Sequence, residues 1–110
     1  MATNYKVLGQ INPTANVMTN AYSVPSATET VISTITVCNQ TGSNVSYSIA
    51  VVPNGITPTA DKHFIVRGGA VPAADSIGIT LGITLDADDQ IRCNTNSGDV
   101  SFNVFGSEVT

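Results

Sequence analysis

The chain has 110 residues, enough for one domain, and Val, Ile and Thr make up 37 of them, while strong helix formers are scarce. Because β-branched side chains pack well on a pleated sheet and lose rotamer freedom in a helix, this composition argues against a helical bundle, a coiled coil or a doubly wound α/β enzyme. A net charge of −4 and scattered basic residues argue against nucleic acid or an anionic membrane as partner; these residues are Lys6, Lys62, Arg67 and Arg92.

The N-terminal half of the chain alternates apolar and polar residues with period two, the pattern of a strand with one buried face. Two weaker strands are expected at residues 5–10 and 20–24, and the irregular stretch 11–18 makes residues 1–18 a candidate arm. Two stronger strands follow, and their apolar positions are predicted to face the core. The inward set is Val31, Ile35 and Val37 in the first, and Val45, Tyr47, Ile49 and Val51 in the second.

The C-terminal half alternates most clearly over residues 76–85, which we predict to form one continuous strand. The pair Gly68-Gly69 predicts a bulge or bend. Residues 106–110 are a candidate tail that extends the last strand or lies on a neighbouring molecule. The inward positions are Ile77, Ile79, Leu81, Ile83 and Leu85 in the long strand, Phe64, Val66, Ile91 and Cys93 in shorter ones, and Val100, Phe102 and Val104 in the last.

Turn-forming residues separate these strands. Hairpin connections are predicted at residues 39–44 and 94–99, and turns or corners at 52–55, 71–75 and 86–89. About eight strands and no helix remain, so two sheets must cover each other's apolar faces. The sequence therefore predicts a single all-β domain over residues 1–110, an antiparallel β-sandwich with an immunoglobulin-like or jelly-roll-like strand order.

His63 is the single histidine, and Asp61 lies two positions before it, on the same side of an extended segment. No Gly-x-Ser-x-Gly motif supplies a nucleophile for these two side chains. We therefore interpret His63 as a surface or interface residue at the start of a strand.

Asp86, Asp88 and Asp89 place three carboxylates within four residues, and Asp75 lies in the preceding turn. Clustered carboxylates suit Ca²⁺, and a pair that flanks a cleft suits glycoside hydrolysis. The spacing lacks the glycine and distal glutamate of a helix–loop–helix calcium site, and the chain has no Trp to stack on a sugar. We interpret the cluster as a solvated turn and expect no enzymatic activity and no catalytic, cofactor-binding or metal-binding residues.

Cys38 and Cys93 are interpreted as free, mostly buried thiols of a protein folded in a reducing cytoplasm, with a disulfide between them as the alternative. With one histidine they cannot complete a four-ligand zinc site of Cys and His. Asn39 and Asn44 each begin a glycosylation pattern. The N-terminus lacks the apolar run of a secretion signal, so we expect these matches to be chance.

The outward positions of the predicted strands are short and uncharged, mainly Thr, Ser, Gly and Asn. Such a surface has little electrostatic protection against association and loses little rotamer entropy when it is covered. It favours a protein that sits against partners. Most aromatic side chains are predicted to face inward, with Phe105 as the exception; the others are Tyr5, Tyr22, Tyr47, Phe64 and Phe102.

Five stretches resemble a family of small virion proteins of tailed bacteriophages, especially those of marine cyanobacteria. Together they touch most of the chain, and none holds a catalytic residue of that family. The stretches are residues 5–10, 22–25, 31–39, 81–85 and 101–109.

The resemblance implies a non-enzymatic structural protein of the virion, assembled in the host cytoplasm. We expect a capsid decoration protein, also called a cement or knob protein, bound to the outside of an icosahedral shell. The implied partners are the major capsid protein, other virion subunits and further copies in a homo-oligomer or multicopy array, without nucleic acid or membrane. The alternative is a tail or fibre component, including a receptor- or glycan-binding appendage.

Overall fold

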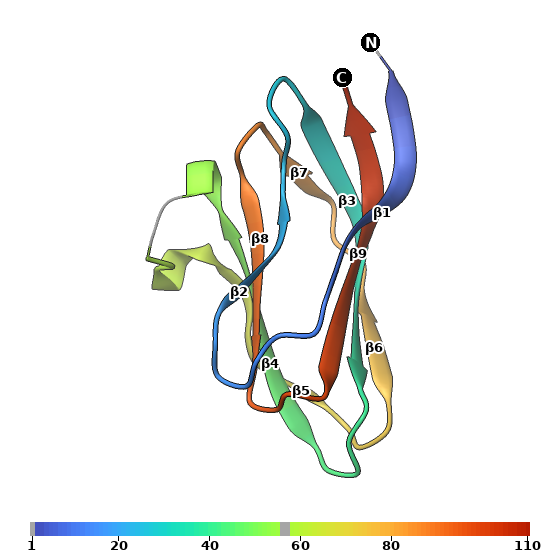
Figure 1. Ribbon diagram of the computed structural model, residues 1–110, viewed down its shortest axis with the longest axis vertical. Helices are drawn as coiled ribbons and strands as arrows, with labels where there is room; N and C mark the ends of the chain where they lie inside the picture. Colours follow the sequence, from blue (N-terminus) through green and yellow to red (C-terminus); the bar gives the residue numbers. More distant parts are fainter. Residues whose placement is uncertain (1, 56–57) are drawn as a thin grey trace.

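The computed structural model describes residues 2–55 and 58–110, which form two antiparallel sheets packed face to face (Figure 1). The predicted all-β sandwich is confirmed. None of the described helical turns has the length and hydropathy to cross a bilayer. The first sheet has the strand order β1 (Thr3–Ile11), β9 (Val100–Val109), β3 (Glu29–Asn39), after which β6 (Ser76–Ile79) and β7 (Ile83–Leu85) both pair with β3. The second sheet has the order β2 (Thr19–Ser23), β8 (Gln90–Thr95), β4 (Val45–Val52), β5 (Phe64–Val71). Two 3₁₀ turns are also present, η1 (Pro53–Gly55) and η2 (Asp61–His63).

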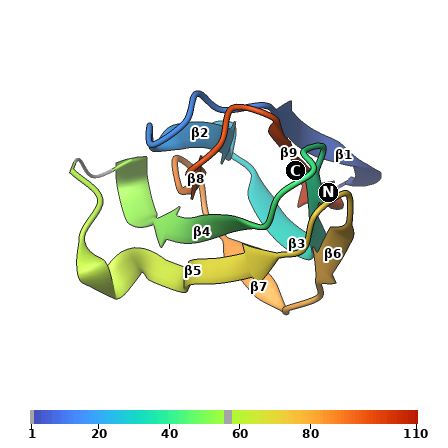
Figure 2. The same ribbon diagram turned by 90° about the horizontal axis from the view of Figure 1, so that it is seen from below.

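The strand order is that of a jelly roll. β1 pairs with β9, β2 with β8, β3 with β6 and β7, and β4 with β5, as if one long hairpin were wrapped around the core. This pairing decides between the two strand orders that the sequence left open. Figure 2, seen from below, shows β4 and β5 on one side of the domain and β1 and β9 on the other.

Most connections lead from one sheet to the other, so two predicted hairpins are wrong. Residues 39–44 join β3 to β4, and residues 94–99 join β8 to β9, and in each case the two strands lie in different sheets. Asn39 closes the first of these arches. Its amide nitrogen donates to the carbonyls of Ser43, Val71 and Pro72 at 2.8–3.2 Å, so it crosses the gap between the sheets.

Two one-residue bulges lie on either side of β9 beside Phe105. In β1 the register shifts between Val7, opposite Phe105, and Gly9, opposite Val104. In β3 it shifts between Ile32, opposite Gly106, and Thr34, opposite Phe105. Each bulge inserts one residue, and one inserted residue moves the rest of the strand to the other face.

The predicted inward position of Val31 is wrong, because the bulge in β3 turns this residue outward. Val31 is 43% exposed, whereas Thr30 and Ile32 are each 1% exposed. The alternation from Val31 to Val37 would hold in a regular strand. Ser33 is the inserted residue, so Ile35 and Val37 face the core as predicted while Val31 faces outward.

The predicted continuous strand over residues 76–85 is also wrong, because it is divided into β6 and β7 beside the same bulge. β6 pairs with β3 from Ile35 to Cys38, and β7 pairs with it from Thr30 to Ile32. The break between β6 and β7 lies opposite the bulge, where a straight partner would lose its register. Leu81 lies in this break and is 43% exposed instead of buried.

The core consists of the inner faces of both sheets, as the alternation predicted for β4, β8 and β9. Phe102 of β9 and Tyr47 of β4 contact across it, with ring centroids 6.4 Å apart. The predicted bulge at Gly68-Gly69 is confirmed: Gly68 has φ of +70°, and the register between β4 and β5 shifts there. A side chain at Gly69 would collide with the Tyr47 ring, since its Cβ would lie 2.6 Å away.

The bulged level of the sheet requires glycine at position 106. A Cβ there would lie 2.1 Å from the Val31 carbonyl oxygen, a backbone atom that cannot move aside. We expect Gly106→Ala to lower the free energy of unfolding by about 2–3 kcal/mol in urea titrations, because overpacking forces the strands apart. Gly78→Ala is the matched control, since its nearest neighbour lies 4.0 Å away. Equal stability of the two variants would contradict the tight packing at Gly106.

Candidate functional site

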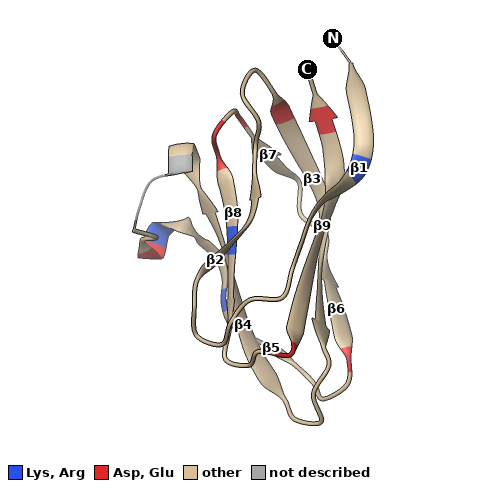
Figure 3. Ribbon diagram, in the orientation of Figure 1, with Lys and Arg blue, Asp and Glu red and all other residues tan. Residues whose placement is uncertain are grey.

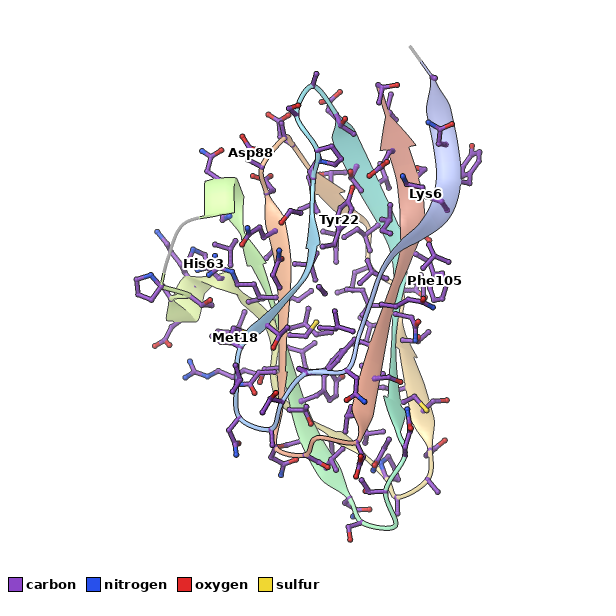
Figure 4. All side chains as sticks on the ribbon, in the orientation of Figure 1. Lys6, Met18, Tyr22, His63, Asp88 and Phe105 are labelled. Atoms are coloured by element: carbon purple, nitrogen blue, oxygen red, sulfur yellow. The ribbon has the colours of Figure 1, made fainter. Side chains whose placement is uncertain are left out.

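His63 is buried, so its predicted position on the surface is wrong. The side chain is 6% exposed, and its Nδ1 accepts a hydrogen bond of 2.9 Å from the backbone N–H of Ala60. Asp61 instead pairs with Arg67, whose guanidinium lies over the Phe64 ring. His63 precedes β5, as predicted, and holds the turn that leads into that strand (Figure 4).

The acidic cluster shapes the corner between β7 and β8. The Asp89 carboxylate accepts hydrogen bonds of 2.9 Å from the backbone N–H groups of Asn54 and Asp86, and Asp86 accepts one from Ala87. Asp88 has a left-handed φ of 70°, a conformation that Asp tolerates in turns. Within residues 2–55 and 58–110, no group of three or more His, Cys, Asp or Glu side chains is placed to hold a metal ion.

Both cysteines are free thiols, as predicted. Cys93 is fully buried in the core, and burial raises its pKa to about 12, which leaves it unreactive. Asn39 is 2% exposed and its amide is fully used in the arch, whereas Asn44 is exposed and accepts from the backbone N–H of Ala73. Cys38 on β3 is half-buried, whereas neither Cys93 nor Asn39 offers a reactive surface group.

An apolar groove crosses the outer face of β1, β9 and β3. Tyr5 is 85% exposed, Val7 49% and Val31 43%. The inward position predicted for Tyr5 is therefore wrong, because the bulge in β1 separates it from the inward half of the strand. We call this surface the outer groove; its volume is about 630 Å³, and its lining is Tyr5, Lys6, Val7, Val31, Ser33, Phe105, Gly106 and Ser107.

Strand register explains why these side chains meet. Ser107 of β9 lies between Tyr5 of β1 and Val31 of β3, and Phe105 lies beside Val7 in the next row. The groove is thus built on three hydrogen-bonded strands. The Ser33 hydroxyl donates a hydrogen bond of 3.1 Å to the Phe105 carbonyl oxygen. With few free polar groups, the surface suits an apolar protein partner better than a polar small molecule.

A buried polar network lies beneath the outer groove. Glu108 is 7% exposed; one carboxylate oxygen lies 2.6 Å from Lys6 Nζ, and the other accepts a hydrogen bond of 2.6 Å from Tyr22. The Tyr22 hydroxyl also lies 2.8 Å from Thr30 Oγ1. The network joins β1, β9, β2 and β3 and satisfies the charge that Glu108 carries into the interior.

The network shifts the pKa values of its members. The hydrogen bonds from Lys6 and Tyr22 lower the pKa of Glu108, although burial opposes them. Burial, followed by the bond to Glu108, raises the pKa of Tyr22 to about 12. Glu108 therefore stays ionised and Tyr22 stays protonated at neutral pH. Figure 3 shows that most other acidic residues lie at strand ends and in connections.

A second, polar pocket of about 100 Å³ lies on the outer face of β4 and β8. It is lined by Asn16, Ser46, Tyr47, Ser48, Asn94, Thr95 and Asn96. Asn94 Oδ1 is buried and has no hydrogen-bond partner among the described residues. Because Asn94 lines the pocket, this oxygen is a candidate acceptor for a donor that enters it.

Comparison with protein-family models and with curated proteins finds no match for this chain. The site therefore rests on its own geometry. The sequence contained one signal of the outer groove, the adjacent apolar residues Val7 and Leu8, which cannot share one face of a regular strand.

The pH dependence of stability tests the buried network. The pKa of Glu108 is lower in the folded protein than its ordinary 4.5. The ionised carboxylate therefore makes its full contribution to the free energy of unfolding above about pH 4.5, and this contribution is lost as the pH falls through the lowered pKa. We expect Glu108→Gln to remove this dependence and to cost about 1 kcal/mol at pH 7, because Lys6 is half-exposed and solvent screens its charge.

Urea unfolding between about pH 2 and pH 7 measures both effects. Glu29→Gln is the control, because Glu29 is exposed on β3 of the same sheet and should leave the dependence intact. If wild type and Glu108→Gln lost stability equally on acidification, the network would not hold the charge as described.

Proposed function

We propose that this chain is a non-enzymatic structural protein of a bacteriophage virion, which decorates and stabilises the outside of the capsid through protein–protein contacts. The outer groove is the observation that carries the proposal. It is an exposed apolar surface on a hydrogen-bonded sheet, with Tyr5, Val7 and Phe105 from neighbouring strands. Exposed apolar surfaces of this kind in soluble domains are typical of protein interfaces.

The resemblance to small phage virion proteins coincides with this surface. Three of its five stretches, residues 5–10, 31–39 and 101–109, belong to β1, β3 and β9, the strands that build the outer groove. The resemblance supports the virion as location and the major capsid protein as partner. The jelly-roll fold by itself does not support a virion function, because proteins with this fold have many unrelated functions.

Binding would combine a rigid face with many weak contacts. Short side chains such as Ser33 and Ser107 lose little rotamer entropy when covered, and the strand backbone is already ordered. A capsid presents the same surface many times, so modest affinity at each contact suffices when neighbouring copies are also linked. Multiple copies in an array follow from this arrangement.

A charge placed in the outer groove tests the proposal. We expect Val31→Lys to reduce occupancy on undecorated phage heads about tenfold, because burying an unpaired ammonium in an apolar interface is unfavourable. Val17→Lys is the control: Val17 is also 49% exposed but lies outside the groove lining. Occupancy measured by quantitative gel densitometry of purified heads compares the variants. Unchanged binding of Val31→Lys would exclude the outer groove as the capsid contact.

The second candidate function is a tail or fibre component that binds a receptor glycan, and the polar pocket on β4 and β8 favours it. Asn94 Oδ1 and the hydroxyls of Ser46 and Ser48 could accept and donate hydrogen bonds to sugar hydroxyls. This function predicts selective binding on a glycan array and about a tenfold loss with Asn94→Ala. Val17→Lys should bind as wild type does. Absence of selective binding would remove this candidate.

A further inference from the structure

One half of β1 has an uncovered edge. Every residue from Ala2 to Val7 is exposed, although this segment is hydrogen-bonded to β9 along its other side. Figure 1 shows this end of β1 at the margin of its sheet. Farther along, β2 approaches the strand so closely that a Cβ at Gly9 would lie 2.1 Å from the Ala21 carbonyl oxygen. The free edge is therefore residues 3–7.

The pairing of β1 with β9 determines which backbone groups of residues 3–7 point toward the open edge. Ala2 and Thr110 exchange two backbone hydrogen bonds, of 2.8 and 2.9 Å. In an antiparallel ladder such pairs alternate with pairs that exchange none. Asn4 and Lys6 therefore also bond to β9, whereas Thr3, Tyr5 and Val7 turn their N–H and C=O groups toward the open edge.

The other sheet edges are interrupted. β2 has five residues and a register shift between Asn20 and Tyr22, and β5 pairs with β4 through two register shifts, one of which is the bulge at Gly68. β6 and β7 have four and three residues and are separated by a break. Short and bulged edges resist strand addition. Residues 3–7 form an uninterrupted edge, and the one charge on it, at Lys6, is paired with Glu108.

We propose that residues 3–7 pair with the same residues of a second copy in antiparallel orientation, about a two-fold axis at Tyr5. In this register Tyr5 faces Tyr5 of the other copy, and Thr3 faces Val7, so every outward backbone group of the edge finds a partner. Lys6 lies opposite Asn4 of the other copy, which keeps the two ammonium groups from facing each other. A register centred on Val7 would require pairing at Gly9, where β2 lies.

The pairing deepens the proposed function without depending on it. Two sheets would become one continuous sheet, and the two outer grooves would adjoin across the axis, with aromatic and β-branched side chains in cross-strand contact. Such a dimer would present a double apolar surface to a capsid. Its formation in solution does not require the capsid, so the dimer and the capsid contact can fail separately.

A charge swap at the two-fold axis tests this register. Sedimentation velocity of the full chain should show a concentration-dependent monomer–dimer equilibrium. Tyr5→Lys and Tyr5→Glu should each raise the dimer dissociation constant about tenfold or more, because like charges face each other and the aromatic contact is lost. An equimolar mixture of the two variants should recover dimers, since opposite charges then meet at the axis.

Val31→Lys is the matched control, because it adds the same charge to the same face away from the edge and should leave the dimer intact. Tyr5 is 85% exposed, so circular dichroism melts of its variants should match wild type at concentrations where the wild type is monomeric. A monomer at every concentration would overturn the proposal. So would a dimer that Tyr5→Lys leaves unchanged, or a mixture that associates no better than either variant alone.

Discussion

The paired bulges at Leu8 in β1 and Ser33 in β3 are the constraint on which the outer face of this protein depends. Both adjoin Phe105 of β9, so β1 and β3 change face at one level of the sheet while β9 between them keeps its alternation. Below that level the alternation directs Ile35 and Val104 into the core. Above it, Val7 and Val31 face solvent on either side of Ser107 and Phe105, and the outer groove results.

This end of the sheet needs polar support because its apolar side chains point outward. Where a regular strand would place aliphatic residues, the interior contains Thr30, Tyr22 and the Glu108 carboxylate. Lys6 reaches the carboxylate from β1 and compensates its burial. The network holds β1 and β9 to both β3 and β2, so the exposed strand that carries Tyr5 keeps a fixed position. The groove and the free edge of β1 are consequences of the same arrangement.

The local pattern of the sequence was sufficient for the fold class, because alternation and turn residues act within a few positions. The bulge at Gly68-Gly69 could also be predicted, since glycine there permits a positive φ. The predictions for Val31, Leu81 and Tyr5 were wrong because each depends on a bulge in β1 or β3, and the alternation within one strand does not specify an inserted residue. The two arches were predicted as hairpins because turn composition does not distinguish a return within a sheet from a crossing between sheets.

The sequence by itself determined that the chain forms a charge-poor sandwich of antiparallel strands, because the pleat imposes a period of two on any half-buried strand. Only the tertiary structure decided the jelly-roll order, the face of each residue beyond a bulge, and the meeting of Tyr5, Phe105 and Val31 in one groove. These features arise from pairing between strands that are far apart in the chain, such as Tyr5 with Ser107, 102 positions apart, and Val31 with Ser107, 76 positions apart. Register over such distances is set by the packing of the whole core, and no short segment contains it.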